Sequence, residues 1–512
     1  MLAPVDESAR PAGAALPVSP YVGVFRGVSR ELTTTALGHP AAVSCHNCYA
    51  GSGNAPLSLA AANARIAKAV AEGADFIELD VIEVGGLLYA SHSDVAAKGS
   101  LPLLTDLLAA PALRDTDTLL VIEVKEADAD PLLFADALLS ALSTQSTRAQ
   151  VVREGRPLFL KSFNTKLAYL LALKNKASEW PSLTPYLRYY LLHSGLASLS
   201  ELQQELEEQA VENGLDGIDL FFRTPHLAAI SGYMRSLGLG VGVWTVPGPA
   251  LGELGMLALR EQADVITTDL PLDRARALVE AQNVRTHFDA RDLAAAADLT
   301  VFSVTPFSAS KQQVLLEPSA PILERGAVGD VMFGGALRFA QDKALTLPPP
   351  GPSSSPGFVV SALVRFNSLT LLPNQTMPIL AQLDEGAFRF ELARGEAGGT
   401  ELRFGVNVDG AFRYRSRSVA GDASASCDGL ANVAFVPALD TEHAYLLTGV
   451  YTPEGRVLLF INLQCAGVTA PVQMGNLKSS QAGVRLGRPL GLEDERVVAF
   501  DGSVQRIDVL DW

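Results

Sequence analysis

The chain has 512 residues, a formal net charge of −16 and 48% hydrophobic residues, and its mean hydropathy is +0.20. This length predicts two or three domains, and the hydrophobic content indicates packed globular domains rather than disorder. The negative charge argues against nucleic acid as a partner and provides no attraction to anionic membranes. No apolar run approaches the roughly 20 residues that span a bilayer, so we expect no transmembrane segment.

Residues 1–40 are rich in Ala, Pro and Ser and have no sustained periodicity. We expect them to form an irregular N-terminal arm, because a terminus is poorly ordered unless it is tied down. No signal peptide is visible, since no basic segment followed by an apolar one occurs there. On this ground the protein is either cytoplasmic or has had a leader removed or replaced.

Short apolar runs alternate with amphipathic segments over residues 41–287, which we assign to one domain. The apolar runs predict eight strands: Ala41–His46, Phe76–Glu83, Thr118–Lys125, Leu158–Phe163, Tyr186–Leu192, Gly217–Phe222, Gly240–Val246 and Val265–Asp269. The amphipathic segments predict eight helices: Leu59–Glu72, Leu103–Ala109, Leu132–Ser143, Thr165–Lys176, Leu199–Asn213, Pro225–Leu237, Leu251–Gln262 and Leu272–Ala281. Eight strand–helix units over about 245 residues match the length and element order of a TIM barrel.

Polar side chains lie at or near the ends of the first predicted strands. His46 ends the first run, Glu78 and Asp80 lie two apart in the second, and His92 follows an extra strand-like segment, Leu87–His92. Alternate residues of a strand point to one face, so Glu78 and Asp80 project together. Two carboxylates held this way are costly unless a cation lies between them, and oxygen ligands suit Mg²⁺ or Ca²⁺.

Further candidates lie where later strands end. Glu123 and Lys125 are two apart in LLVIEVKEA, and Lys161 and Trp244 lie in the fourth and seventh strands. The site of such a barrel is formed at the C-terminal ends of its strands. Each residue also has a structural interpretation: Lys161 as a surface lysine and Trp244 as a core residue.

Three more residues are left outside the set of candidate site residues. We interpret Asp269 as the cap of the last helix and His193 as a loop histidine. Asp219, in GIDLFF, faces either the site or a structural partner, and we leave it outside the set of candidate site residues.

The order HN…IELDV…SHSD…IEVKE resembles the glycerophosphodiester phosphodiesterases and the phospholipase C-like phosphodiesterases. The resemblance covers roughly residues 41–282. The pair His46–Asn47 is more similar to the phospholipase C-like relatives, because glycerophosphodiesterases usually have Arg after this histidine. The second histidine, His92, is followed by Ser93 rather than by the usual Asp. The resemblance implies a TIM barrel, two catalytic histidines and a divalent metal held by carboxylates.

The resemblance assigns roles to the candidate residues. It implies that His46 and His92 are the acid–base pair and that Glu78, Asp80 and Glu123 hold one Mg²⁺ or Ca²⁺. Asn47, Lys125, Lys161 and Trp244 are then expected to bind the substrate, a small-molecule or lipid-headgroup phosphodiester. Attack by a neighbouring substrate hydroxyl would give a cyclic phosphate, and which histidine is the acid stays open.

The pattern becomes all-β towards the C-terminus. We interpret residues 288–325 as a connector and residues 326–512 as an antiparallel sandwich, with strand-like runs at Phe358–Phe366, Phe388–Leu392, Glu401–Val408, Tyr445–Tyr451, Val457–Ile461, Gly483–Leu486 and Gly502–Leu510. The order ALRF…FVVSALVRF…VLLFINLQ…FDGSVQRIDVLD resembles the concanavalin A-like, laminin G-type jelly-roll domain. That domain type implies a glycan or protein ligand and favours a secreted or extracytoplasmic location, although the sequence leaves the location unknown.

The four cysteines fall into two pairs. Cys45 and Cys48 bracket His46 as C-H-N-C, and a local disulfide or a zinc site are the two alternatives, although no second ligand pair follows at zinc spacing. Cys427 and Cys465 both lie in the C-terminal region and are a candidate pair there, with a redox state that the sequence leaves open.

Two other functions compete with a metal-dependent phosphodiesterase. In the first, the chain is a glycan- or protein-binding protein whose barrel is inactive, but the intact set of histidines, carboxylates and Lys125 argues against it. In the second, the carboxylates hydrolyse glycosides. Glu78 and Asp80 are too close in sequence to flank a glycosidic bond, and that chemistry leaves both histidines unexplained.

Overall fold

The structure is a computed structural model of the chain. It describes residues 41–92, 101–114, 118–127, 130–143, 157–194, 198–224, 226–248, 251–260, 262–279, 284–290, 300–305, 308–313, 322–324, 336–340, 343–347, 349–350, 356–383, 386–395, 398–420, 438–462, 464–468, 477, 483–487 and 496–511. The expected N-terminal arm, 1–40, and Cys427 lie outside the described residues, so the pairing of Cys427 with Cys465 stays a prediction.

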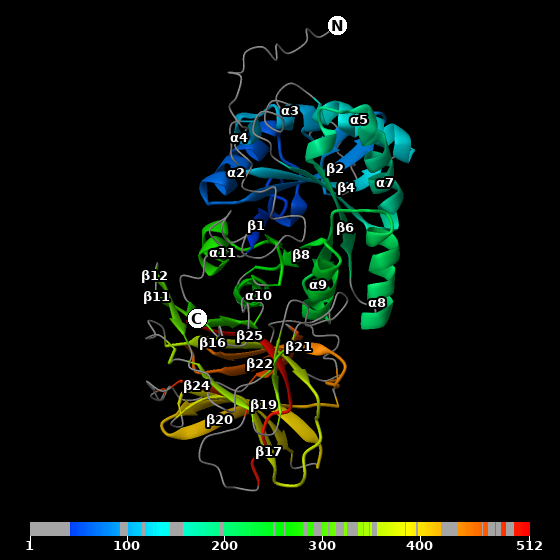
Figure 1. Ribbon diagram of the computed structural model, residues 1–512. Coiled ribbons are helices and arrows are strands. Elements are labelled where there is room, and N and C mark those ends of the chain that lie inside the picture. The colour runs from blue at the N-terminus through cyan, green and yellow to red at the C-terminus, as the bar shows by residue number, and fades with distance from the viewer. Residues whose placement is uncertain are drawn as a thin grey trace.

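The first half of the chain forms a closed barrel of eight parallel strands, which confirms this part of the fold prediction (Figure 1). The strands are β1 (Ala42–Cys45), β2 (Phe76–Val84), β4 (Leu119–Ala127), β5 (Leu158–Phe163), β6 (Leu187–His193), β7 (Gly217–Phe221), β8 (Gly240–Val246) and β9 (Val265–Thr268). The barrel closes because β1 pairs in parallel with both β2 and β9. The extra segment β3 (Leu87–Ala90) folds back antiparallel on β2 beyond a turn at Gly85 and Gly86, which both have positive φ angles.

Helices connect the strands, and several begin at capping residues. The helices are α2 (Leu59–Ala71), α3 (Leu104–Leu108), α4 (Pro111–Arg114), α5 (Pro131–Leu142), α7 (Leu167–Lys176), α8 (Leu199–Leu206), α9 (Leu227–Ser236), α10 (Leu251–Leu259) and α11 (Leu272–Val279). The side chains of Ser58, Asp130 and Ser198 accept hydrogen bonds from the first turns of α2, α5 and α8. A π-helical turn, η6 (Glu207–Val211), extends α8 to the length that the sequence predicts.

The barrel interior has an apolar floor near the N-terminal ends of the strands. One buried cluster contains Ala42, Phe76, Leu119, Val121, Phe159, Tyr190 and Val265. The ring of Phe159 lies edge-on to those of Phe76 and Tyr190, with centroids 5.2 and 5.5 Å apart. Because these rings exclude water from below, polar groups farther along the same strands are reached only from the C-terminal mouth.

The second half of the chain forms two antiparallel sheets. The larger has the order β12-β11-β10-β25-β16-β21-β22-β23, with β13 and β14 attached, and the smaller has the order β15-β24-β17-β18-β19-β20. Their bounds are β10 (Val284–Asp289), β11 (Thr300–Thr305), β12 (Ser308–Gln313), β13 (Ile322–Glu324), β14 (Ala336–Phe339), β15 (Ala344–Leu347), β16 (Phe358–Phe366), β17 (Thr376–Gln382), β18 (Phe388–Arg394), β19 (Thr400–Val408), β20 (Ala411–Ser418), β21 (Ala444–Tyr451), β22 (Val457–Ile461), β23 (Gln464–Val468), β24 (Val484–Gly487) and β25 (Gly502–Asp511). The sheets share one hydrophobic core, in which Phe358 of β16 meets Phe388 of β18.

The segment expected to connect the two domains carries strands of the larger sheet. Strands β11, β12 and β13 lie within residues 288–325, and β10 pairs antiparallel with β25 from residue 284 onward. The sequence SASKQQ of β12 is polar and gives no alternating apolar pattern, so it does not predict a strand. In the described sheet β12 lies at the end of the order and pairs with β11 through its backbone, which does not require that pattern.

The larger sheet buries its second face against the barrel. Along β16, Phe358 and Val360 point into the core between the sheets, whereas Val359 belongs to the hydrophobic cluster of the barrel. Leu458, Phe460 and Leu510 join Val359 there. A strand alternates its faces, so a sheet that is apolar on both faces must be covered on both. The two halves therefore share buried surface.

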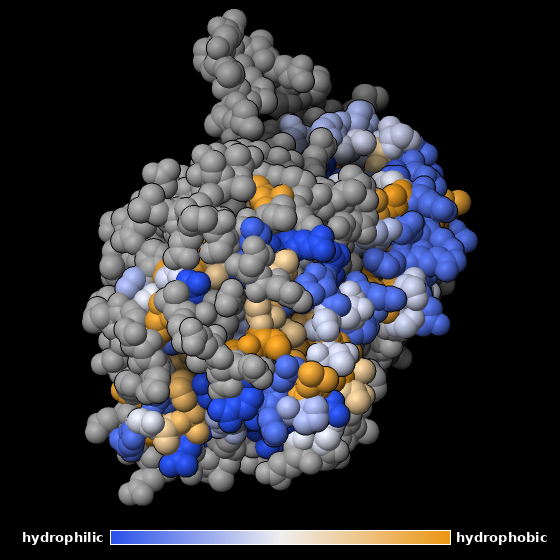
Figure 2. Space-filling model, turned by 60° about the horizontal axis from the view of Figure 1, so that its bottom comes forward, coloured by the Kyte–Doolittle hydropathy of each residue, from blue (hydrophilic) through white to orange (hydrophobic). Residues whose placement is uncertain are grey.

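The described surface is mixed in character. Figure 2 shows hydrophobic residues as several separate small patches among hydrophilic ones. The large hydrophobic residues that are exposed in the described ranges are Leu59, Leu87, Leu132, Leu133 and Leu372. None of the described helices is both long enough and apolar enough to cross a bilayer.

The first prediction tests the shared surface between the two halves. Leu510→Ala should destabilise the whole chain by about 2–5 kcal/mol, because it removes a side chain with 0% exposure at that interface. The matched control is Leu372→Ala, whose leucine is 64% exposed and should cost under about 0.5 kcal/mol. Urea unfolding followed by tryptophan fluorescence measures both, and equal effects of the two substitutions would contradict a packed interface.

Candidate functional site

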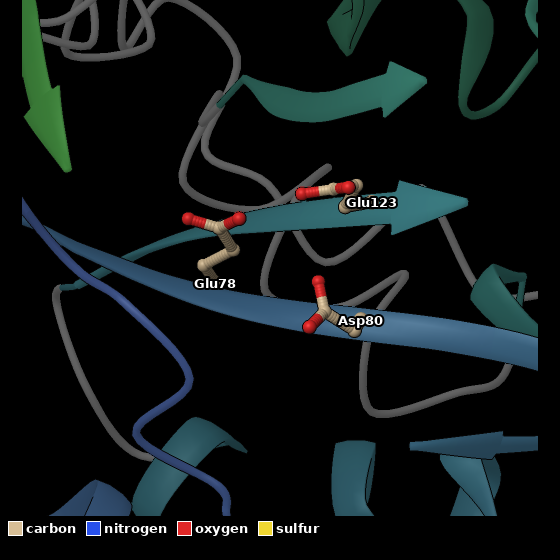
Figure 3. A group of neighbouring side chains, drawn as sticks. All are labelled: Glu78, Asp80 and Glu123. Atoms are coloured by element: carbon tan, nitrogen blue, oxygen red, sulfur yellow. The ribbon is translucent and has the colours of Figure 1, made fainter. Parts of the chain in front are cut away.

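Three carboxylates meet inside the barrel, above the apolar floor. Glu78 and Asp80 project from β2 and Glu123 from β4, and β2 and β4 pair so that Asp80 lies directly opposite Glu123 (Figure 3). One oxygen of each carboxylate lies within 4.8 Å of the others. The three side chains are buried, so water does not screen their charges from one another.

Two lysines provide positive charge beside these carboxylates. Lys125 Nζ lies 2.5 Å from Glu123 Oε1 and 3.6 Å from Asp80 Oδ1. Lys161, in register with Glu123 on β5, places Nζ 2.6 Å from Asp219 Oδ2 and 3.6 Å from Glu78 Oε2. The sequence predicted that Lys161 binds substrate, and the structure buries it between two carboxylates.

The cluster has more negative than positive groups. The four carboxylates of Glu78, Asp80, Glu123 and Asp219 face the two ammonium groups of Lys125 and Lys161, so full ionisation leaves an excess of two negative charges. This excess matches the charge of one divalent cation.

The pKa values follow from the same crowding. Burial opposes the ionisation of Glu78, but the charges of Lys161 and His46 outweigh it and lower the pKa of Glu78 to about 2. Burial raises the pKa of Asp80 to about 6, and the charge of Glu78 adds to the rise. Burial and the charge of Asp80 raise the pKa of Glu123 well above its ordinary value. Burial and crowding therefore favour the protonated forms of Asp80 and Glu123, and a bound cation would relieve this.

The cluster fits a divalent metal ion. Glu78 Oε2 and Asp80 Oδ1 are buried and accept no hydrogen bond, and the neighbour of the buried Glu123 Oε1 is the ammonium group of Lys125. A buried carboxylate oxygen without a hydrogen bond is costly, and coordination by a cation removes that cost. Three carboxylate ligands form an all-oxygen set, which suits Mg²⁺ or Ca²⁺ rather than a soft metal.

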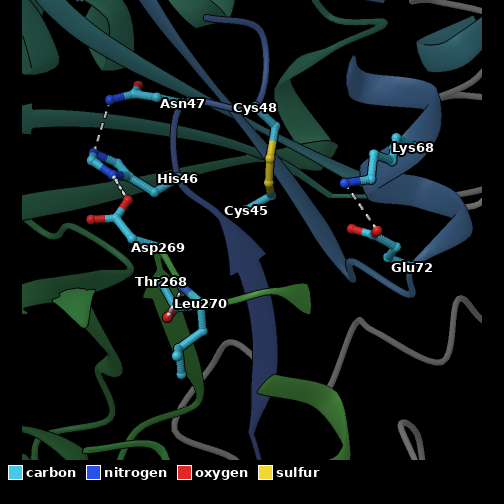
Figure 4. Close-up of a disulfide and its surroundings, with 9 residues drawn as sticks. All are labelled: Cys45, His46, Asn47, Cys48, Lys68, Glu72, Thr268, Asp269 and Leu270. Carbon is cyan, nitrogen blue, oxygen red and sulfur yellow. Dashed lines mark hydrogen bonds and ion pairs between the residues drawn. A yellow bond between two sulfur atoms is a disulfide. The ribbon is translucent and has the colours of Figure 1, made fainter. Parts of the chain in front are cut away.

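His46 lies at the mouth and is held by residues from both ends of the barrel sequence. It directly follows β1, and Asp269 directly follows β9, the strand that closes the barrel against β1. Nδ1 of His46 lies 2.7 Å from Asp269 Oδ1, and Asn47 Nδ2 lies 2.9 Å from His46 Nε2 (Figure 4). Asn47 also donates to Asn54 Oδ1 at 3.0 Å.

His46 and His92 have pKa values shifted in opposite directions. Burial lowers the pKa of His46, but the hydrogen bond to Asp269 and the charge of Glu78 outweigh burial and raise it above the ordinary 6.5. Burial and the positive charge of Lys125 lower the pKa of His92 below 6.5. The two rings lie nearly perpendicular, with centroids 6.5 Å apart. The first proton taken up by the pair therefore resides on His46.

An aromatic group lines the side of the mouth formed by β5, β7 and β8. Trp244 packs against Phe163 and Phe221, with ring centroids 5.2 and 5.1 Å away, and its Nε1 donates to the carbonyl oxygen of Asp219. Lys125 Nζ lies 5.5 Å from the centroid of Phe163. This half-buried apolar wall therefore adjoins the charged cluster.

Cys45 and Cys48 form a disulfide around His46 and Asn47 (Figure 4). Of the two alternatives that the sequence leaves open, the structure therefore contains the local disulfide rather than a zinc site.

Three residues that contact the site were not assigned to it from the sequence: Asp219 was left open, Asp269 was interpreted as a helix cap, and Tyr49 was not considered. Tyr49 donates its hydroxyl to Asp80 Oδ2 at 3.0 Å, Asp219 pairs with Lys161, and Asp269 bonds His46. Asp269 could have been found, because closing the barrel must bring the end of the last strand beside the end of the first. Tyr49 carries no such signal. His193 pairs with Glu205 of α8, with Nε2 and Oε1 3.1 Å apart.

Comparisons with known proteins found similar solved structures but no matching family. No family model matches the chain, and no curated protein matches it. A phosphodiesterase structure from Oleispira antarctica, in complex with the product sn-glycerol-3-phosphate, is 19% identical, covers 46% of this chain and 96% of its own, and gives a TM-score of 0.35. A candidate glycerophosphoryl diester phosphodiesterase from Silicibacter pomeroyi is 15% identical, covers 51% and 97%, and gives 0.36.

A third similar structure is the binding domain of botulinum neurotoxin serotype D. It is 8% identical, covers 45% of this chain and 49% of its own, and gives a TM-score of 0.31. Identities and TM-scores of this size support no conclusion about what this chain binds or cleaves, so the function must be argued from the site itself.

The second prediction tests the carboxylate cluster. Glu123→Gln should abolish the rise in thermal stability that Mg²⁺ or Ca²⁺ gives the unmodified protein, a rise of about 2.7 kcal/mol at 100 times Kd. Metal-free stability should change less than it does on removal of an ordinary ion-paired carboxylate, because burial and the charge of Asp80 already raise the pKa of Glu123 and oppose its ionisation.

The control for this prediction is Glu391→Gln, which alters another buried carboxyl, in the smaller sheet and beside Arg389. Differential scanning calorimetry with and without the metal salt measures all three proteins. An undiminished metal-dependent rise in Glu123→Gln would remove Glu123 from the site.

Proposed function

We propose that the barrel is a divalent-metal-dependent phosphodiesterase that cleaves a glycerophosphodiester or phospholipid-type phosphodiester. The observation that carries this proposal is the convergence of three buried carboxylates, with two histidines and a lysine at the same mouth. The order of motifs along the chain, which resembles the phospholipase C-like phosphodiesterases, supports the same function.

The carboxylates of Glu78, Asp80 and Glu123 hold the cation, either Mg²⁺ or Ca²⁺. When bound, the metal supplies Lewis-acid stabilisation of negative charge on the phosphoryl oxygens. Tyr49 orients Asp80 through its hydroxyl, and Lys161 holds Glu78 and Asp219 in the interior. These contacts fix the ligands on rigid strands before a cation arrives, which lowers the cost of binding it.

The histidine pair moves the protons. His46, with the raised pKa, is the general acid that protonates the leaving alkoxide, and Asp269 holds its ring through Nδ1. His92 stays neutral because of burial and the charge of Lys125, so it is the general base for the attacking hydroxyl. Attack by a neighbouring hydroxyl of the substrate gives a cyclic phosphate, and attack by water gives hydrolysis directly.

Lys125 and the aromatic wall bind the rest of the substrate. Lys125 lies at the mouth and places positive charge against the phosphate, whereas Lys161 acts as an internal counterion. Asn47 can turn its amide group towards His46 or towards a phosphate oxygen. Trp244, Phe163 and Phe221 present aromatic rings to an alcohol or a choline-like headgroup.

The same proposal extends to the C-terminal half. The motif order supports a concanavalin A-like, laminin G-type sandwich with a glycan or protein ligand, and this domain type favours a secreted protein. The buried contact with the barrel gives the sandwich a structural role in addition.

Hydrolysis of bis(p-nitrophenyl) phosphate, with and without EDTA, tests the proposed function. We expect turnover that EDTA abolishes and that added Mg²⁺ or Ca²⁺ restores. Turnover that is indifferent to chelation would contradict metal dependence, and binding of glycans without any diester cleavage would favour a binding protein with an inactive barrel.

The third prediction assigns the two histidines. His46→Asn and His92→Asn should each lower turnover on an alkyl phosphodiester by about 10²-fold or more, and their effects should be strongly non-additive. A p-nitrophenolate leaving group needs little protonation, so it should rescue His46→Asn but not His92→Asn. Steady-state kinetics on both diesters measure this asymmetry, and the opposite pattern of rescue would exchange the roles.

The fourth prediction concerns pH. Activity requires neutral His92 and protonated His46, so the acidic limb should lie below pH 6.5 and the basic limb above it. Asp269→Asn removes the carboxylate charge that raises the pKa of His46 and should move only the basic limb to lower pH. The control is Asp273→Asn, which alters a carboxylate of α11 outside the site. A basic limb that does not move in Asp269→Asn would contradict the assigned role of Asp269.

A further inference from the structure

The disulfide Cys45–Cys48 flanks His46, the proposed general acid, and its neighbour Asn47. Cys45 is the last residue of β1, His46 and Asn47 follow, and Cys48 closes the ring with Cα atoms 5.8 Å apart. This separation falls in the ordinary range for disulfides. The bridge therefore constrains the backbone on both sides of His46.

The enclosed backbone places the side chain of Asn47 against that of His46. Asn47 has a φ of 50°, in the left-handed region, which asparagine adopts more readily than most residues and which Asn54, Asn374, Asp409 and Asn462 also adopt. Its side chain in that conformation reaches both His46 Nε2 and Asn54 Oδ1. Release of the bridge would let residues 46–48 leave this conformation, and the bond from His46 Nδ1 to Asp269 would be formed less often.

The restraint is local rather than global. The stabilisation that a disulfide gives rises with the logarithm of the number of residues in the loop that it closes. Cys45 and Cys48 are only three residues apart, so this loop is very short. Cys45 is buried within the hydrophobic cluster of the barrel, where neighbouring side chains hold β1 in place without the bridge. The principal effect of this disulfide should therefore be on the geometry of His46.

We propose that Cys45 and Cys48 are positioning residues for His46 and that the oxidation state of this pair sets the phosphodiesterase activity. The inference rests on the proposed function. The oxidised protein is the active form, and the reduced protein keeps its fold and its metal site but loses the alignment of His46 with Asp269.

The reduction has a defined course. Cys48 is half-buried and Cys45 is buried, so a thiolate of a dithiol reductant attacks the sulfur of Cys48 and expels the Cys45 thiolate. The second thiolate of the reductant then displaces Cys48, which leaves two protein thiols and one cyclic disulfide. Two electrons and two protons pass from reductant to protein, and an oxidant that accepts two electrons reverses the step.

The experiment compares oxidised and dithiothreitol-reduced full-length protein at saturating Mg²⁺ or Ca²⁺. Reduction should lower kcat on an alkyl phosphodiester by about tenfold or more, the scale of a displaced catalytic group, with little change in KM. It should move the basic limb of the pH profile to lower pH. The p-nitrophenyl diester should lose much less turnover, since it needs little protonation, and reoxidation should restore the original values.

Two variants separate this pair from the other cysteines. Cys45→Ala/Cys48→Ala should resemble the reduced protein and ignore dithiothreitol, whereas Cys427→Ala/Cys465→Ala should keep the full response. A reduced protein with the kcat and basic limb of the oxidised one would overturn the proposal. So would equal losses on both diesters together with a lowered unfolding temperature, because these indicate general destabilisation.

A readout without turnover separates this inference from the proposed function. The C2 proton of His46, identified from its loss in His46→Asn, is titrated by NMR in oxidised and reduced protein. If the oxidised protein cleaves no diester, the proposed function fails, but the pKa of His46 should still fall on reduction. An unchanged pKa of His46 would overturn the positioning role whatever the activity.

Discussion

The burial of three carboxylates at one level of the barrel is the constraint on which the rest of the site depends. Glu78, Asp80 and Glu123 cannot all be ionised in a water-poor interior unless positive charge is supplied nearby. Lys125 and Lys161 supply part of this positive charge, and Asp219 neutralises much of the charge of Lys161. The remaining deficit of positive charge is why the cluster fits a divalent cation, and it also raises the pKa values of Asp80 and Glu123.

Closure of the barrel brings further polar side chains to the mouth above this cluster. Pairing of β1 with β9 brings His46 and Asp269 together across 223 residues of sequence, on the same mouth as the carboxylates. Phe76, Phe159 and Tyr190 form part of the apolar cluster at the other end of the barrel. The packed sheets of the C-terminal half support the barrel from outside, where Val359 and Leu510 enter its hydrophobic cluster.

The sequence predicted the barrel well because apolar residues recur with different periods in its strands and helices, and because the ends of these segments are clear. It also predicted that Glu78, Asp80 and Glu123 lie together, since strand alternation and the order of parallel strands determine both facts. The contacts of Lys161 depend on a side chain that reaches strands that are not its neighbours, and a linear pattern does not record such contacts. Strand β12, within residues 288–325, was missed for a different reason, because the polar sequence SASKQQ gives no alternation.

The most direct test of the central claim is to titrate Mg²⁺ or Ca²⁺ into the chelated full-length protein while calorimetry and diester turnover are recorded on the same sample. The account predicts one cation bound per chain, with turnover that rises in proportion to the fraction of protein bound. Full turnover before any cation binds, or binding of one cation without turnover on any phosphodiester, would contradict it.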